Sequence, residues 1–351
     1  MQNRMGLLFF LVALLVACSG KGPAPAQELH VYNWSAYIDP QIYRDFEAEF
    51  GIRVVEDTFA SNEELLAKLQ AGATGYDIIV PSDYMVSIML QQGLLAELDR
   101  SKIPNLVNID PQFSSPPYDP GMRYCVPYQW GTTGIGYNSA TLPTAPDSWA
   151  YLFDPDLASR YAGKFTMLND AREVIGAALK YLGYSMNTTN EAELLAARDL
   201  LIRQKPWVYA YDSEQYRALL PAGEIVMAQG YSGDVFMVAE EDERIRYVIP
   251  REGTSIWMDN LCIPARAPNK EAAHLFINYL LRPDIGARIS NYTRYASPNA
   301  AARAHIEPEL LSDPAVYPPP EVMARLEWIR DVGEATLLYE RIWTEVKAAT
   351  P

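Results

Sequence analysis

Strand-like and helix-like segments alternate in strict order between residues 29 and 93. Two helices carry clear start signals. Asp39-Pro40 supplies an N-cap followed by proline at the first helical position, and Ser61 with Glu64 forms a capping box. A β-α-β-α-β order favours a mostly parallel sheet with helices on both faces. Strands are expected over residues 29–33, 53–59 and 76–80, and helices over residues 39–51, 61–69 and 87–92.

The same alternation starts again further along the chain, after a break. Gly131-Thr132-Thr133-Gly134 separates two extended segments, and we interpret it as a hinge. The predicted fold class is therefore α/β, with two lobes joined by more than one crossing of the chain. Extended segments are expected over residues 124–128, 135–138, 164–168, 224–228 and 257–264, and helices over residues 172–182, 191–204, 270–281 and 333–347.

Aromatic and acidic residues follow the carboxyl ends of five predicted strands. Ligands of open α/β sheets bind at this edge, so these side chains are candidates for one binding site. Helix N-termini at that edge hold anions, so a set of carboxylates placed there favours a cationic ligand instead. The candidates are Trp34, Ser35, Tyr37, Ser82, Asp83, Tyr84, Asp170, Glu173, Tyr231, Asp234, Trp257 and Asp259.

An alkylammonium ligand fits this chemistry. Ammonium groups form charge-assisted hydrogen bonds with carboxylates. Aromatic faces attract cations by about 0.5–2 kcal/mol each, and each buried methylene adds about 0.8 kcal/mol. The net charge of −15 suits a cationic ligand, although solubility alone would also explain it. Such an acidic chain is a poor candidate for binding nucleic acid, which selects Lys and Arg.

Several candidates have an ordinary structural alternative. Asp170 and Glu173 lie three residues apart, so they could cap a helix, face one side of it, or do both. Asp83 could be only a helix N-cap. Tyr231 and Trp257 could be core aromatics. Each residue alone is a weak signal, but five strand ends of the same character favour a site.

The N-terminus has the layout of an export signal. Residues 1–17 carry Arg4 and then an apolar run that is shorter than the roughly 20 residues needed to span a bilayer. Leu15-Val16-Ala17-Cys18 resembles a bacterial lipobox, in which the Cys is acylated; a plain signal peptide with an incidental Cys is the alternative. Residues 18–28 read as a tether. We therefore expect a membrane-anchored lipoprotein in the periplasm or at the cell surface.

Signals for catalysis and for metal binding are weak. His30, His274 and His305 are widely spaced, and no nucleophile elbow, P-loop or dinucleotide fingerprint occurs. We expect no enzyme activity, no cofactor and no metal. A secreted enzyme with paired carboxylates, like a glycoside hydrolase, remains an alternative, as does a sensor or adhesin with the same cleft. Whether Cys125 and Cys262 pair stays open at this level.

A combination of segments resembles the spermidine/putrescine-binding proteins of bacterial polyamine ABC transporters. The resemblance implies a two-lobed periplasmic-binding-protein fold of type II that closes on its ligand by hinge bending. It also implies a monomer, a polyamine ligand (putrescine or spermidine), and permease and ATPase subunits as partners. The segments that carry it are residues 32–37, 76–82, 128–131, 170–174, 257–259, 281–284 and 331–333. The lobes expected from it are residues 29–132 with 258–303, and residues 133–257 with 304–351.

The resemblance also assigns roles to single residues. Two departures from spermidine-type members favour putrescine. The segment Tyr231-Ser232-Gly233-Asp234 stands where those members have Trp-Asn-Gly-Ser, so Asp234 could hold the second ammonium of a diamine. Ile329 follows Trp328 where those members have Gln. The matched positions are Trp34, Tyr37 and Trp257 as aromatics along the ligand, Asp170, Glu173 and Asp259 as ammonium-holding carboxylates, Ser82 and Tyr84 as polar contacts, and Tyr295 as a wall residue.

Overall fold

The computed structural model describes residues 27–72, 75–142 and 144–350. The predicted signal segment, residues 1–17, and the predicted lipidation site Cys18 lie outside the described residues. The last two residues of the predicted tether already belong to the first strand, which begins at Gln27. Across the described ranges, no helix is both long enough and apolar enough to cross a membrane.

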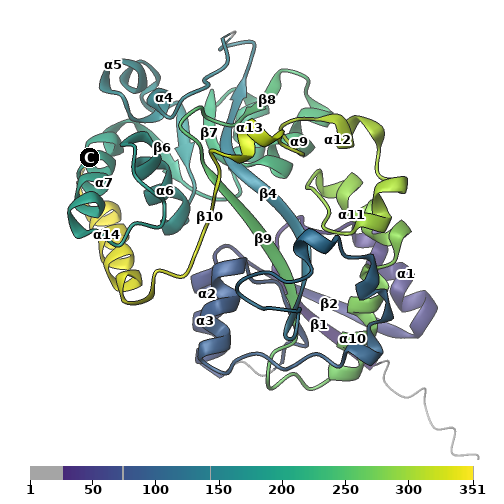
Figure 1. The fold of residues 1–351 in the computed structure, drawn as a ribbon. Helices are drawn as coiled ribbons and strands as arrows, with labels where there is room; N and C mark the ends of the chain where they lie inside the picture. Colours follow the sequence, from purple (N-terminus) through teal and green to yellow (C-terminus); the bar gives the residue numbers. More distant parts are fainter. Residues whose placement is uncertain (1–26, 73–74, 143, 351) are drawn as a thin grey trace, which may run out of the picture.

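The described strands form one sheet, in the order β2-β1-β3-β9-β4-β7-β5-β6, with β10 added to β9 and β8 to β4. Figure 1 shows β4 and β9 running side by side from one half of the molecule to the other, with helices gathered around each half. The strands are β1 Gln27–Trp34, β2 Ile52–Phe59, β3 Ile78–Ile79, β4 Cys125–Asn138, β5 Phe165–Met167, β6 Val208–Tyr211, β7 Met227–Tyr231, β8 Ile245–Val248, β9 Ser255–Cys262 and β10 Glu327–Trp328.

The helices cover the sheet in both halves (Figure 1). We call β1 to β3 with α1 to α3, α10 and α11 the first half, and β5 to β8 with α4 to α9 and α14 the second half. The α-helices are α1 Pro40–Phe50, α2 Asn62–Gln70, α3 Asp83–Gln91, α4 Ala150–Phe153, α5 Pro155–Ala158, α6 Ala171–Tyr181, α7 Glu191–Gln204, α8 Tyr216–Ala222, α9 Ser232–Glu241, α10 Lys270–Leu280, α11 Pro283–Thr293, α12 Pro308–Ser312, α13 Pro320–Met323 and α14 Thr336–Ala348.

The first half follows the predicted pattern closely. Strand β1 pairs in parallel with both β2 and β3, which confirms the parallel start of the sheet. Helix α1 begins where expected, because the Asp39 side chain accepts a hydrogen bond from the Gln41 N–H at 2.8 Å and Pro40 follows at once. The helix ends at Gly51, whose φ of 68° suits a left-handed cap.

Each half has its own hydrophobic core. In the first half, Phe46 of α1 and Phe276 of α10 are fully buried beside β1. In the second half, Trp149 and Phe165 are fully buried, and the C-terminal helix α14 adds Ile342 to the same core. Two cores joined by long strands agree with a two-lobed α/β fold. The residue boundaries of the lobes stay a prediction.

The expected separation of two strands at Gly131-Thr132-Thr133-Gly134 is wrong, whereas the role of this segment as a hinge stays a prediction. These residues lie inside β4, a continuous strand of 14 buried residues. The glycines are there because neighbouring groups approach closely. A Cβ on Gly131 would lie 2.9 Å from the Trp257 ring, and one on Gly134 would lie 2.5 Å from the carbonyl oxygen of Val248. Glycine in this pattern therefore marks tight packing of the crossing strand.

Other boundaries also differ from the predictions. Helix α3 begins at Asp83, four residues earlier than expected. Apolar residues lie on all sides of this helix, so the sequence lacks the helical hydrophobic period from which its start could be predicted. Strand β7 covers residues 227–231 instead of 224–228. Strands β6 and β8 were not predicted. Both are short, with four residues each, and both have mixed burial.

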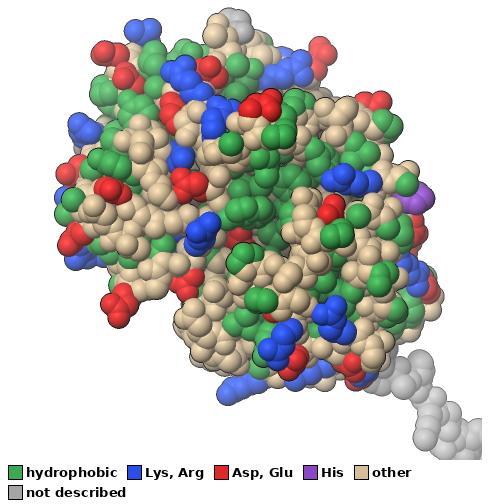
Figure 2. Space-filling model, viewed as in Figure 1, with side chains coloured by type: hydrophobic (Ala, Val, Ile, Leu, Met, Phe, Trp, Pro, Cys, Tyr) green, Lys and Arg blue, Asp and Glu red, His purple; other side chains and the backbone are tan. Residues whose placement is uncertain are grey.

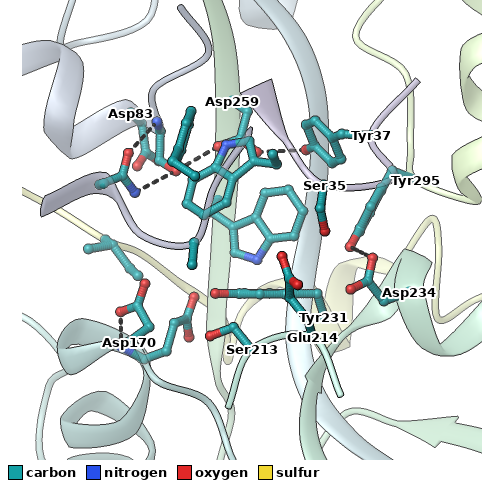
Figure 3. A pocket seen from close by; sticks show the side chains of 18 of the residues that line it. Ser35, Tyr37, Asp83, Asp170, Ser213, Glu214, Tyr231, Asp234, Asp259 and Tyr295 are labelled. Carbon is teal, nitrogen blue, oxygen red and sulfur yellow. Dashed lines mark hydrogen bonds between the residues drawn. The ribbon is translucent and has the colours of Figure 1, made fainter. Parts of the chain in front are cut away.

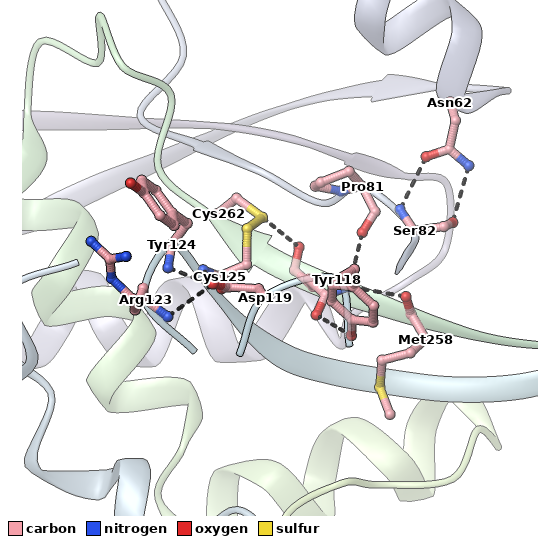
Figure 4. The surroundings of a disulfide bond; sticks show 11 residues. Asn62, Pro81, Ser82, Tyr118, Asp119, Arg123, Tyr124, Cys125, Met258 and Cys262 are labelled. Atoms are coloured by element: carbon pink, nitrogen blue, oxygen red, sulfur yellow. Dashed lines mark hydrogen bonds between the residues drawn. A yellow bond between two sulfur atoms is a disulfide. The ribbon is translucent and has the colours of Figure 1, made fainter. Parts of the chain in front are cut away.

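Cys125 and Cys262 form a disulfide, which the sequence had left open. They are register partners at the end of the antiparallel pairing of β4 with β9. The Asp119 carboxylate holds the start of β4 beside the bond by accepting from the N–H groups of Tyr124 and Cys125, both at 2.9 Å (Figure 4). The disulfide therefore joins the two crossing strands at their first-half end.

Candidate functional site

A pocket lies between the two halves, beside the crossing strands. Figure 2 shows the surface hollowed between the halves, with hydrophobic side chains gathered along the hollow. The empty space of the pocket, counted with its mouth that opens to solvent, is about 670 Å³. The residues lining it are Trp34, Ser35, Tyr37, Phe59, Ala60, Asn62, Ser82, Asp83, Tyr84, Asp170, Glu173, Ser213, Glu214, Tyr231, Asp234, Trp257, Asp259, Tyr295 and Ile329.

The pocket brings together every ligand-binding residue that the sequence singled out. The first half supplies the residues after β1 and β3, and the second half supplies those around α6 and after β7. The residues after β1, β3 and β7 lie at the ends of parallel strands, as the edge rule for open α/β sheets predicts. Trp257 and Asp259 do not follow a strand end as expected, because they lie inside β9, which pairs antiparallel with β3 and β4. Six lining residues were not among the predicted contacts: Phe59, Ala60, Asn62, Ser213, Glu214 and Ile329, of which only Ile329 had been considered.

Asp259 of β9 is the carboxylate that receives the shortest hydrogen bonds here. The Tyr37 hydroxyl donates to its Oδ2 and the Ser82 hydroxyl to its Oδ1, both at 2.6 Å. Asn62 in turn donates to Ser82 Oγ at 3.0 Å, which fixes the serine (Figure 4). Burial raises the pKa of Asp259 to about 7, although the two hydroxyl groups lower it. A cation beside this carboxylate would relieve the cost of burial.

Asp83 is the first residue of α3, directly after Ser82 at the N-cap. It is therefore not the N-cap itself, which was the structural alternative. Its Oδ1 accepts from the Tyr84 N–H at 2.8 Å, and the residue is buried in the pocket wall. Burial raises the pKa of Asp83, and the charge of nearby Asp259 raises it further.

Asp170 and Glu173 do what both sequence alternatives proposed. Asp170 is the N-cap of α6, because its Oδ1 accepts from the Glu173 N–H at 3.1 Å. Both side chains also line the pocket, where Ser255 donates to Glu173 Oε2 at 2.7 Å. Burial and the charge of Asp170 raise the pKa of Glu173 to about 8. Capping and facing a ligand are thus compatible roles.

Glu63 is an acidic neighbour of the pocket that the sequence assigned only to a helix start. The Tyr84 hydroxyl donates to its Oε1 at 2.9 Å, so Glu63 lies behind a lining residue. Burial and then the charge of Asp170 raise its pKa to about 7. In the sequence, Glu63 belongs to the capping-box motif Ser61-Asn62-Glu63-Glu64 at a helix start. Two acidic residues in the first turn usually stabilise a helix by interacting with its dipole, so nothing in the motif pointed to the pocket.

Aromatic rings form the walls between the carboxylates. The Trp257 ring meets Tyr295 and Tyr231 with centroids 5.2 and 5.9 Å apart, and Tyr37 meets Tyr295 at 5.3 Å. The indole N–H of Trp34 donates to the Val80 carbonyl at 2.9 Å, which fixes its ring. Tyr231 and Trp257 are thus packed aromatics and pocket residues at the same time. Rings held edge to face present rigid surfaces to a ligand.

Asp234 lies at another end of the pocket, beside Tyr295 (Figure 3). It belongs to the first turn of α9, directly after β7. Its oxygens accept hydrogen bonds from the hydroxyl groups of Tyr216 at 2.8 Å and Tyr295 at 3.0 Å. Arg217 Nη1 lies 3.8 Å from Asp234 Oδ2. Burial raises the pKa of Asp234, and the charge of Arg217 opposes that shift.

The unpredicted lining residues were missed for two reasons. Ser213 and Glu214 lie between β6 and α8, and β6 was itself not predicted. Phe59 is the last residue of β2 and Ala60 follows it, so both stand at the carboxyl end of a predicted strand, where the edge rule could have found them. They were passed over because neither is acidic.

The sequence matches the model of the bacterial extracellular solute-binding proteins over residues 41–318. The chain belongs to this family. The spermidine/putrescine-binding periplasmic protein of Salmonella typhimurium is 38% identical and spans 96% of both chains. The putrescine-binding periplasmic protein SpuD of Pseudomonas aeruginosa is 39% identical and spans 99% of this chain and 100% of its own.

Solved structures confirm the predicted fold class for this solute-binding protein. A putative spermidine/putrescine ABC transporter protein from Listeria monocytogenes matches with a TM-score of 0.87 at 39% identity, covering 92% of this chain and 100% of its own. The binding protein MotA from A. tumefaciens, solved with glucopine, matches with a TM-score of 0.76 at 21% identity. The latter likeness concerns the fold alone, so the ligand must be argued from the pocket.

The pocket of this solute-binding protein has the chemistry of a cation site. Besides Asp234, four buried carboxylates line it together with aromatic rings, and no lysine or arginine is among the lining residues of the described chain. Over the same described residues, no group of three or more His, Cys, Asp or Glu side chains has the geometry to hold a metal ion. His274 has a structural role, accepting from the Asp99 N–H at 2.9 Å. The four carboxylates are Asp83, Asp170, Glu173 and Asp259.

Proposed function

We propose that this protein binds a polyamine, putrescine or spermidine, and delivers it to the permease and ATPase subunits of an ABC importer. The observation that carries the proposal is the set of buried carboxylates with raised pKa values between aromatic walls. An ammonium group would pair with an ionised carboxylate and restore the solvation that burial removed. The named relatives bind spermidine or putrescine, which supports the same ligand class.

Each part of the ligand has a place in the pocket. We assign the ammonium groups to Asp259 with Asp83, and to Asp170 with Glu173, since these carboxylates lie on different elements around one pocket. The methylene chain would lie against Trp34 and the other rings, where burial and cation–π attraction both stabilise it. Tyr37 and Ser82 would keep Asp259 ionised by donating to it.

Binding calorimetry on the protein without its first 26 residues tests the proposal. Asp259→Ala should weaken putrescine and spermidine binding at least about 30-fold, since a lost buried charge pair costs 2–5 kcal/mol. Trp34→Ala should weaken both about tenfold or more. Asp147→Ala is the matched control, because this aspartate is 58% exposed and outside the pocket. Unchanged binding in both pocket variants would contradict the site.

The remaining expectations concern the place and state of the protein. The periplasmic names of the relatives support export, and we propose a monomer tethered through a lipid on Cys18, with no catalytic activity of its own. Cys18→Ser should release the full-length protein from membranes into the soluble fraction. Retention of that variant in membranes would contradict the lipid anchor.

A further inference from the structure

The guanidinium of Arg217 contacts three residues that line the pocket without lining it itself. Its Nη2 donates to Ser35 Oγ at 3.0 Å, and its Nε donates to the Glu214 carbonyl at 3.3 Å. Its Nη1 lies 3.8 Å from Asp234 Oδ2. The side chain is only 22% exposed, and all three kinds of guanidinium nitrogen have a partner. A positive charge is therefore fixed behind one end of the pocket.

Asp234 is already well partnered at this end. Besides Arg217, it accepts hydrogen bonds from Tyr216 and Tyr295. The end with Asp170 and Glu173 differs. Its nearby cation, Arg172, directs its guanidinium to the Arg330 carbonyl at 2.9 Å and to Asn187 Oδ1 at 3.0 Å. Asp234 is thus paired with a cation of the protein itself, although the nearby carboxylate of Glu214 also lines the pocket. Burial raises the pKa values of Asp170 and Glu173, and the charge of Arg172 opposes that shift, but Arg172 forms no ion pair with either, so these carboxylates are left for a ligand.

We infer that Arg217 is a specificity-determining residue, which favours diamines over longer triamines because it repels an ammonium group at the Asp234 end. Two like charges near each other in a poorly solvated site oppose one another strongly. A diamine places its two ammonium groups at the other carboxylates, whereas a triamine must bring a third one towards Arg217. This inference rests on the proposed polyamine function.

The sequence had suggested another route to the same preference, in which Asp234 itself holds the second ammonium of putrescine. The two mechanisms make opposite predictions for Asp234→Asn. If Asp234 holds the ammonium, the variant loses more affinity for putrescine than for spermidine. If Arg217 excludes the third ammonium, the variant leaves that arginine without its anionic partner, so spermidine loses more.

Arg217 also joins the two halves, since Ser35 belongs to the first half and Arg217 to the second. A contact that only held the halves together would serve every amine equally. Its removal would weaken putrescine and spermidine by the same factor. The ratio of the two affinities therefore separates selection by charge from a purely structural contact.

Calorimetric titration of Arg217→Gln, Arg217→Lys and Asp234→Asn with putrescine and with spermidine tests the inference. Arg217→Gln should shift the affinity ratio towards spermidine about tenfold or more, which corresponds to about 1.4 kcal/mol. Arg217→Lys keeps the charge and should leave the ratio within about threefold of the unaltered protein. Arg251→Gln is the matched control, because Arg251 also pairs with an aspartate of the second half but is 65% exposed and outside the pocket.

The outcomes separate this inference from the proposed function. An unaltered protein that binds neither amine would contradict the function itself. If it binds an amine but Arg217→Gln leaves the ratio unchanged, or weakens both amines by one factor, the inference is wrong and the function stands. A larger loss of putrescine than of spermidine in Asp234→Asn would also overturn it. Thermal unfolding of each variant shows whether it is folded, and Asp234→Asn, for which the two mechanisms make opposite predictions, decides the question if Arg217→Gln is not.

Discussion

Asp259 shows how a buried carboxylate is prepared for a cationic ligand. Its two oxygens each accept one hydroxyl hydrogen bond, and burial still raises its pKa to about 7. The site is therefore partly protonated near neutral pH when it is empty. An ammonium ligand selects the ionised form, so binding must release protons in this range. Affinity for polyamines should accordingly rise between pH 6 and pH 8.

Tyr37→Phe directly tests how the Tyr37 hydroxyl affects the pKa of Asp259. Losing one hydroxyl donor to a charged acceptor costs about 1.5–3 kcal/mol, so the pKa of Asp259 should rise by at least about one unit. Putrescine binding at pH 7 should weaken about tenfold, and much of the loss should disappear at pH 8.5. Calorimetry across this pH range gives the measurement.

Tyr128→Phe is the control for that change. The Tyr128 hydroxyl donates to the Tyr37 carbonyl at 3.0 Å and its ring packs edge-on against Tyr37, but it does not bond to Asp259. It should therefore leave the pH profile in place. A Tyr37→Phe profile that overlaid the unaltered one would show that Asp259 does not bind the ligand in its ionised form.

Among the elements, β4 shows most clearly where prediction from the sequence failed. Gly131 and Gly134 were expected to separate two strands, yet both lie inside one fully buried crossing strand against close neighbours. A single sequence shows that glycine is required but not whether the reason is a turn or a close approach. Helix starts were easier to predict, because a cap such as Asp39 acts on its own helix.

The site was predicted better than the strands that carry it. Strand ends such as Trp34 and Asp170 have a local signature of turn and cap chemistry, which also places them at the shared edge of the sheet. Glu214 and Glu63 carry no comparable sequence signal, because their positions at the pocket depend on how segments that are distant in the sequence pack together. Arg217 is the extreme case, since its proposed role depends on a contact with Ser35 across a sequence separation of 182 residues.

Gly134→Ala should destabilise the protein by about 1–3 kcal/mol, the usual cost of inserting a group into a packed core. The added Cβ would lie 2.5 Å from a backbone oxygen of β8, so a strand must move. Urea unfolding followed by circular dichroism gives the change. Gly75→Ala is the matched control, because a Cβ there meets nothing within 4 Å. Equal stability of the two variants would show that β4 can relax freely.

The disulfide between β4 and β9 makes a second prediction at this scale. It closes a loop across a sequence separation of 137 residues, and such bonds commonly stabilise proteins by about 2–4 kcal/mol. Changing both cysteines to serine should lower the free energy of unfolding by about that amount while leaving polyamine affinity nearly unchanged, since neither cysteine lines the pocket. A large loss of affinity with little loss of stability would show instead that the disulfide contributes to polyamine binding.

The buried acids also couple the pocket to the stability of the whole molecule. Unfolded aspartate and glutamate have pKa values of about 4, whereas burial raises those of Asp259 and Glu63 to about 7 and that of Glu173 to about 8. Between these limits the folded state binds more protons than the unfolded state. The stability that these groups contribute is therefore present below pH 4 and is lost as pH rises through their folded pKa values.

We therefore expect the melting temperature of the ligand-free protein to fall between pH 5.5 and pH 8.5. Acids with lowered pKa values, such as Asp242, act in the opposite sense only below that window, because they are fully ionised within it. Saturating putrescine should raise the melting temperature more at pH 8.5 than at pH 5.5, since it binds the ionised native state. Differential scanning calorimetry at both pH values gives the comparison.

Glu173→Gln is the variant that assigns the effect to the pocket. It removes the group whose pKa is raised to about 8 while it keeps the shape of the side chain and an oxygen that can accept from Ser255. The melting temperature of this variant should fall less steeply above pH 7 than that of the unaltered protein, because one titrating group is gone. The same slope in both proteins would mean that burial of Glu173 carries no cost, and the pH dependence of stability would then have to come from the other buried carboxylates, such as Asp259.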